Sequence, residues 1–207
     1  MFELKFKIME KESSITPEES LRIISEMINK TKEEYGSNSF YFLLWGYLIS
    51  IACLLQFSLI KLLINTSQHA FVGLVSAILW GIIVLSGFAI QYNYIGKHKK
   101  QVKIKTHIGE FLAVHWQVNG ALIIIAGLFC WKYHIHPSPF ILAICGAATM
   151  ITGMLIKQKT LVTGSLFMLA FSVIALWIDN EYQLIINAVA IIFGYILPGY
   201  SLKSLNK

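Results

Sequence analysis

Charged residues are scarce in this chain, and their scarcity excludes an ordinary soluble domain. Asp, Glu, Lys and Arg make up 14% of the 207 residues, whereas a typical soluble domain has about 25%. Hydrophobic residues make up 56%, and the mean hydropathy is +0.64. These values are typical of a protein that crosses a membrane several times.

Arginine, cysteine and catalytic motifs are scarce as well. Only one of the 17 basic residues is Arg, the usual phosphate-clamping residue, and the lysines lie in short segments between apolar stretches. We therefore expect no nucleic-acid partner. The three Cys have no metal or redox spacing and are expected to act as small hydrophobic residues. Gly-rich phosphate loops and carboxylate pairs are absent, so we predict no catalytic residue, cofactor or metal ligand.

Six apolar stretches are long enough to cross a bilayer, which takes about 20 residues. We therefore expect an all-α, polytopic helical membrane protein in which the lipid bilayer surrounds six spans. Residues 1–15 form a charged tail with no cleavable signal segment, and residues 203–207 form a second tail. The spans are expected at about 40–64, 70–95, 111–131, 138–156, 160–178 and 182–202.

The lysines between these stretches predict an orientation. With six spans, fifteen of the 17 basic residues fall on one side of the membrane, and only Lys61 and Lys132 fall on the other. Loops that are rich in Lys and Arg stay in the cytoplasm. Both termini and the five-lysine segment 97–105 are therefore expected in the cytoplasm.

Residues 16–36 predict an amphipathic helix ahead of the first span. Thr16 and Glu19 have the spacing of a capping box, and Pro17 falls at the first helical position, where its missing N–H costs nothing. Gly36 is suited to the left-handed conformation that closes a helix. This helix is expected in the cytoplasm, next to the ends of the spans.

One side of this helix is apolar and the other is acidic. The apolar stripe contains Leu21, Ile24 and Ile28, and from Glu18 to Glu34 the acidic residues outnumber the basic ones by two. Helices that lie on anionic lipid usually have a basic polar face. Besides an interfacial helix held by its stripe alone, we therefore expect packing on protein. Either the helix folds back under the bundle, close to the lysines of 97–105, or the stripe binds a protein partner.

The junction between this helix and the first span has a distinctive sequence. It opens with T-P-E-E-S at residues 16–20 and continues with S-N-S-F-Y-F-L-L-W-G at residues 37–46. This combination resembles a family of small bacterial multi-pass membrane proteins that have a short cytoplasmic helix before an aromatic-rich first span. The family has no assigned activity and supplies no functional residues. The resemblance implies a location in the bacterial cytoplasmic (inner) membrane.

Small residues recur at four-residue spacing in several spans, which lets helix backbones approach closely in lipid. One such row is Gly73, Ala77 and Gly81, and another includes Ala190 and Gly194. We expect these rows to hold the monomer together. A homo-oligomer stays open.

Polar residues within the spans concentrate in the cytoplasmic third of the third span. His115 and Asn119 share one face, and Glu110 and Gln117 share another. Ionisable groups inside a bilayer are costly and therefore mark functional sites by default, and histidine can shuttle protons near neutral pH. One hypothesis is a solute or proton path that starts at His115, Asn119 and Glu110. The alternative, which we favour, is a helix start at headgroup depth.

A second polar group falls on the outer side. His69, His134 and His136 lie in outer loops, and Asp179 and Glu181 lie in a neighbouring turn. Imidazole and carboxylate groups could bind zinc or copper if these loops converged. We expect solvated loop residues instead.

Three functions remain, in order of preference. The first is a non-catalytic accessory or regulatory membrane component, because buried ionisable chemistry is lacking beside a well-specified acidic helix. The second is a small-solute or proton-coupled transporter or channel that uses the polar part of the third span. The third is a membrane enzyme.

Overall fold

The computed structural model describes residues 16–37, 39–66, 69–98 and 107–204, apart from the side chains of residues 29–37, His69 and His98. The charged tail 1–15, most lysines of the segment 97–105 and the last three residues lie outside the described residues. Within the described ranges the chain is helical and contains no strand. This result confirms the expected all-α class.

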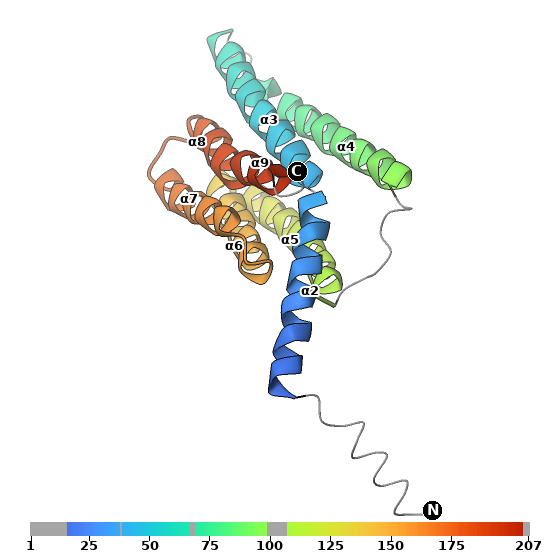
Figure 1. Ribbon diagram of the computed structural model, residues 1–207. Helices are drawn as coiled ribbons and strands as arrows, with labels where there is room; N and C mark the ends of the chain where they lie inside the picture. Colours follow the sequence, from blue (N-terminus) through green and yellow to red (C-terminus); the bar gives the residue numbers. More distant parts are fainter. Residues whose placement is uncertain (1–15, 38, 67–68, 99–106, 205–207) are drawn as a thin grey trace, which may run out of the picture.

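Figure 1 shows the helices of the described ranges. In chain order they are α2 (Pro17–Ser37), α3 (Ser39–Asn65), the 3₁₀ turn η1 (His69–Phe71), α4 (Val72–His98), α5 (His107–Tyr133), α6 (Ser138–Leu155), α7 (Lys159–Ala175), α8 (Gln183–Ile191), the π-helical segment η2 (Ile192–Ile196) and α9 (Leu197–Ser204).

Five helical stretches are long and apolar enough to cross a membrane, which indicates a multi-pass membrane protein. They are α3, α4, α5, α6 and the continuous run from α8 through η2 to α9. Helix α7 is apolar but has only 17 residues. It ends earlier than the expected stretch 160–178 because the N–H groups of Leu176 and Trp177 bond three residues back, to Val173 and Ile174, which tightens the chain into a turn.

The helices α6 to α9 pack closely on one another and on α3. A Cβ atom added to Gly153 of α6 would lie 2.8 Å from the Cβ of Leu161 in α7, and one added to Gly164 of α7 would lie 2.5 Å from the Phe193 carbonyl oxygen in η2. On α3, a Cβ at Gly46 would lie 2.7 Å from the Ile196 side chain. These glycines therefore let backbones approach more closely than any larger residue would allow.

The last apolar run widens at η2 because of Pro198. Proline lacks an N–H, and its ring collides with the carbonyl four residues earlier, here that of Gly194. The π-helical turn from Ile192 to Ile196 absorbs this misfit, and the helix continues to Ser204. The proline therefore widens the helix rather than ending it. Such π-turns occur frequently at functional sites.

Helices α4 and α5 are packed far less. Within their most apolar windows, 6% of α4 and 11% of α5 are buried, whereas 50% of α6 is buried. Helix α4 is joined to α3 by a 3.0 Å hydrogen bond from Trp45 Nε1 to Gln91 Oε1 and by a bond from Gln56 to Ser76. Helix α5 packs on α6.

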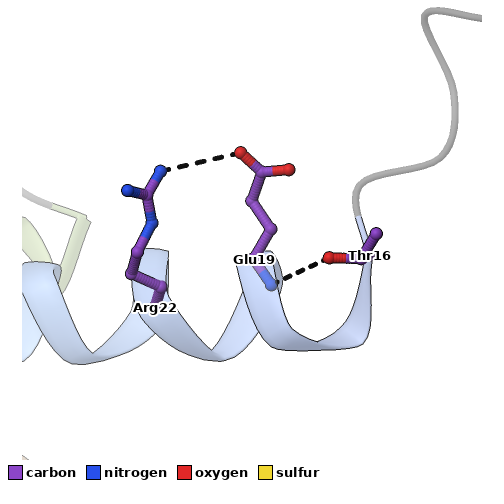
Figure 2. A network of polar contacts seen from close by, with 3 residues as sticks. All are labelled: Thr16, Glu19 and Arg22. Atoms are coloured by element: carbon purple, nitrogen blue, oxygen red, sulfur yellow. Dashed lines mark hydrogen bonds and ion pairs between the residues drawn. The ribbon is translucent and has the colours of Figure 1, made fainter.

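The start of α2 has half of the expected capping box (Figure 2). The backbone N–H of Glu19 donates to Thr16 Oγ1 over 3.2 Å. The Glu19 carboxylate points forward instead of back, and its Oε1 lies 3.6 Å from Nη2 of Arg22. At the other end, Gly36 is helical and does not have a positive φ. No chain reversal is needed there, because α3 begins at Ser39.

The expectation that the stripe of α2 folds back under the bundle is wrong for its first half. Leu21 is 68% exposed and Ile24 is 52% exposed, and Figure 1 shows this half of α2 extending beyond the bundle. Helix α2 contacts α9, α5 and α3. Its 21 residues span about 31 Å, and its axis leads away from the bundle (Figure 1), so its start lies outside the bundle.

Candidate functional site

Two of the expected polar residues of α5 face α6. His115 is half-buried, and its Nε2 lies 3.2 Å from the carbonyl oxygen of Ala148. Asn119, one turn further along, is 6% exposed, and its side chain lies beside the thiol of Cys145. The four-residue spacing places both on the same side of the helix, so both side chains lie at the α5–α6 contact.

Asn119 belongs to a buried polar cluster, which consists of Asn119, Cys145, Thr149 and Tyr195. The Cys145 thiol lies beside the side chains of Asn119 and Tyr195, and Tyr195 also lies beside Thr149. The Thr149 hydroxyl further donates to the Cys145 carbonyl over 2.8 Å. Each of the four side chains is at most 6% exposed. The cluster joins α5, α6 and η2 near the middle of their apolar stretches.

An aromatic group borders the cluster on the side of α3. The ring of Tyr195 lies 5.7 Å from Phe42 and 6.4 Å from Trp116, and Phe42 lies 5.9 Å from Trp116, all close to edge-to-face. Such pairs add to the stability that burial alone provides. They fix the orientation of the Tyr195 ring, which η2 presents to the cluster.

The cluster contains thiol, hydroxyl and amide groups but no charged side chain. Its polar groups lie beside one another, which a low-dielectric interior favours over isolated polar groups. Such groups can exchange hydrogen bonds with a polar solute or with water if the helices part. Glu110 does not belong to the cluster, because it is exposed and lies nine residues before Asn119, about 13 Å along the helix axis.

A second polar group joins the outer connections. The Asn187 amide donates to Ser138 Oγ over 2.8 Å, the Ser138 N–H lies 3.4 Å from Nδ1 of His136, and His136 lies beside Gln183. Burial lowers the pKa of His136 below its usual 6.5, and the neighbouring Gln183 amide partly offsets this effect. One oxygen of Asn187 and one of Gln183 are buried without a hydrogen bond.

The expected outer residues are not gathered into one place. His134 is exposed, Glu181 pairs with Lys61 at 2.6 Å, and the side chain of His69 lies outside the described residues. Among the side chains that the structure describes, no group of three His, Cys, Asp or Glu residues could hold a metal ion.

Sequence reasoning missed three members of the buried cluster. Cys145 was expected to be a small hydrophobic residue, and it is buried in the core, but its thiol also lies beside two polar side chains. Thr149 lies four residues after it on the same face of α6, a spacing that the sequence shows. Tyr195 has no such local signal, because the π-turn that presents it depends on how Pro198 is accommodated within the packed bundle.

Comparisons with protein-family models, with curated proteins and with solved structures gave no match.

Proposed function

We propose that the chain crosses the bacterial cytoplasmic membrane six times, with both termini in the cytoplasm. Three observations support this topology. Fifteen of the 17 basic residues then share the cytoplasmic side. The α6–α7 turn meets the end of the chain through bonds from Gln158 and Thr160 to Ser201. On the other side, the end of α3 meets the α7–α8 turn through the Lys61–Glu181 pair.

The sixth crossing in this topology is α7. Its 17 residues rise about 26 Å, slightly less than the hydrocarbon thickness of about 30 Å. Met168 and Leu161 are fully buried, so one side of α7 packs on the bundle, whereas Leu166, Phe167 and Val173 are at least half exposed. A hydrophobic stretch slightly shorter than the hydrocarbon layer is accommodated by local thinning of the bilayer at a modest cost.

Within this topology, the protein serves as a non-catalytic accessory or regulatory component that binds a partner protein through α2. The observation that carries this proposal is the exposed stripe of α2, on which Leu21 and Ile24 are more than half exposed. An amphipathic helix with an uncovered apolar side suits a groove on a partner.

The polar side of α2 favours a protein over a lipid surface. Glu18, Glu19 and Glu26 lie on this helix, against the single cation Arg22 in its described side chains. The cytoplasmic leaflet is anionic and attracts basic segments, so an acidic helix gains nothing there. A partner with an apolar groove rimmed by Lys or Arg fits both sides of α2.

A photo-crosslinking amino acid at Ile24 tests this proposal in living cells. We expect a discrete adduct of protein size at Ile24 and a much weaker one at Ser25, the adjacent exposed position on the polar side. The triple variant Leu21→Ser, Ile24→Ser, Ile28→Ser should lose the partner in affinity capture. Its control, Leu21→Met, Ile24→Leu, Ile28→Leu, keeps an apolar stripe and should retain it. Adducts with lipid alone at Ile24 would refute the proposal.

The second candidate function is a small-solute or proton-coupled transporter, and the third is a membrane enzyme. The buried polar cluster favours transport. Polar side chains in the middle of apolar helices are costly, and in membrane proteins such groups mark the paths of solutes and ions. His115→Ala and Asn119→Ala should then abolish solute or proton flux in reconstituted vesicles. Unchanged flux in both variants would remove this candidate.

A further inference from the structure

Helix α5 carries a regular row of residues that its own bundle does not use. The residues recur at alternating intervals of three and four, which keeps one seam turned toward a partner helix in a left-handed pair. We call this row the α5 seam. Its members are Glu110, Ala113, Gln117, Gly120, Ile124, Gly127 and Trp131.

Small and larger residues alternate along the seam. Ala113, Gly120 and Gly127 are seven residues apart, and between them lie Gln117 and Ile124. In a helix pair, the larger residues of one helix fit over the small residues of the other, and small residues let two backbones approach closely in lipid. The pattern is therefore that of a helix–helix contact.

The structure leaves this seam uncovered. A Cβ atom added to Gly120 or Gly127 would have no neighbour within 4 Å, and Ile124 is 65% exposed. The side of α5 that packs on the bundle carries Leu112 and Asn119 and lies about 100° around the helix from the seam. The same helix can therefore pack on its own bundle and on a second body at once.

Gln117 indicates which polar groups a protein that packs on the seam must supply. It is exposed and, among the residues that the structure describes, it forms no hydrogen bond. It lies three residues from the middle of α5, about 4.5 Å along the axis, and so within the hydrocarbon layer. Lipid chains offer no hydrogen bond, and an amide left without one in such surroundings is unfavourable. The occupant of the seam must therefore present a donor and an acceptor.

We propose that the seam binds the α5 seam of a second copy of this chain and forms a symmetric dimer. Copies inserted in the same orientation are related by a two-fold axis along the membrane normal, which makes their α5 helices parallel and places each residue opposite itself. An amide both donates and accepts, so Gln117 of one copy pairs with Gln117 of the other. A single polar residue in such a seam also fixes its register.

Two features of the chain fit this arrangement. Helix α4, the other loosely packed helix, is held on α3 by the Trp45–Gln91 and Gln56–Ser76 bonds. Glu110 ends the seam in the first turn of α5, at the water interface, where two facing carboxylates are screened and repel only weakly. The proposal is independent of the partner of α2.

Disulfide cross-linking in native membranes tests the dimer. Ile124 and Ile125 are adjacent and equally exposed, at 65% and 61%, but only Ile124 belongs to the seam. Oxidation should give a covalent dimer with Ile124→Cys and at least about five times less with Ile125→Cys, because the two positions point about 100° apart. The wild-type chain is the blank, since Cys53, Cys130 and Cys145 are buried. Equal yields at both positions, or none at Ile124→Cys, would overturn the proposal.

A reconstitution experiment tests the glycines and the amide. The dimer fraction is measured by single-molecule photobleaching of labelled protein in vesicles, over a range of protein-to-lipid ratios. Gly120→Ile with Gly127→Ile should weaken the dimer at least about tenfold, and Gln117→Leu about threefold. The control pair is Gly73→Ile with Gly81→Ile on α4, where an added Cβ also meets nothing, and it should leave the dimer unchanged. A monomer at every ratio, or equal effects of both glycine pairs, would overturn the proposal.

Discussion

The two halves of this bundle use the same residue types in opposite ways. In α6 to α9, glycines lie against neighbouring helices, so that a Cβ at Gly164 or Gly153 would collide with backbone or side-chain atoms. In α4 and α5, the glycines at 73, 81, 96, 120 and 127 meet no atom within 4 Å, and the exception is Gly87, where a Cβ would lie 2.8 Å from the ring of Trp45 on α3. A small residue in an apolar helix therefore indicates a close approach only where another helix is present to use it.

The difference also separates two roles for polar side chains. Where α5 meets the packed half, the side chains of Asn119, Cys145 and Tyr195 lie beside one another inside the protein. In the loosely packed half, Gln117 has no partner among the described residues. Lipid does not drive apolar helix surfaces together as water does, and it offers polar groups no hydrogen bonds. The loosely packed half is therefore where a further protein surface can be added without rearranging the core.

The largest expected difference in stability between the two halves comes from a Gly→Ala substitution in each of them. Gly164→Ala places a Cβ at 2.5 Å from the Phe193 carbonyl oxygen, which is backbone and cannot turn away. Overpacking of this kind destabilises by about 1–3 kcal/mol. Gly81→Ala meets nothing and should be neutral or stabilising by up to about 1 kcal/mol, because Ala is the better helix former. Unfolding midpoints in mixed detergent micelles measure both, and equal effects would show that the halves do not differ.

Much of this comparison was not predictable from the sequence. Composition and apolar length predicted the all-α membrane architecture, because about 20 apolar residues in a row have few alternatives to a spanning helix. The rows Gly73–Ala77–Gly81 and Ala190–Gly194 looked equivalent, and both were expected to hold the monomer together. Gly194 packs against Met168, but Gly73 and Gly81 meet nothing. Spacing shows that a helix has a smooth side, whereas only the tertiary arrangement decides what lies against it.

The polar site was predictable to a similar extent. His115 and Asn119 were singled out because polar residues in apolar helices are unusual, and the structure brings both against α6. Glu110 was included as the start of the same path although its spacing already placed it on another face of α5, and the structure leaves it exposed. Tyr195 was missed because its position depends on the π-turn before Pro198. Local patterns identify a face of one helix, and the partner that completes a site comes from distant sequence.

A smaller effect is expected from the outer hydrogen bonds of the packed half. Ser138→Ala removes the acceptor of the Asn187 amide, and both side chains are at least nine-tenths buried. Leaving a buried donor unsatisfied costs about 1–3 kcal/mol. The double variant Ser138→Ala with Asn187→Leu removes both partners and should be more stable than Ser138→Ala alone. The same unfolding measurement applies. A double variant that shows the full sum of two losses would contradict this account.

The loosely packed half provides a still smaller contrast between two glutamines. Gln91 accepts a hydrogen bond from Trp45 on α3, and Gln117 has no described partner. Gln91→Leu should destabilise the monomer by about 0.6 kcal/mol, the average for such bonds within a membrane, and should release α4 first. Gln117→Leu should leave the stability of the monomer unchanged, since it removes no contact. The readout is trypsin cleavage in the segment 99–106 together with the unfolding midpoint. Faster cleavage in Gln117→Leu than in Gln91→Leu would reverse the contrast.

The smallest effect is a pH dependence that arises from His136. Because burial lowers the pKa of this imidazole in the fold below 6.5, the unfolded chain takes up a proton first as the pH falls. The unfolded state is then favoured, so stability declines from about pH 6.5 down to the folded pKa, and above pH 6.5 the group has no effect. His136→Gln should flatten this part of the profile of unfolding midpoint against pH, measured from pH 8 to pH 5. His134→Asn is the control because His134 is exposed and has a positive φ of 55°, which Asn tolerates. If His134→Asn flattened the profile as much as His136→Gln, the pH dependence would arise from loop charge in general, and burial within the packed half would have no part in it.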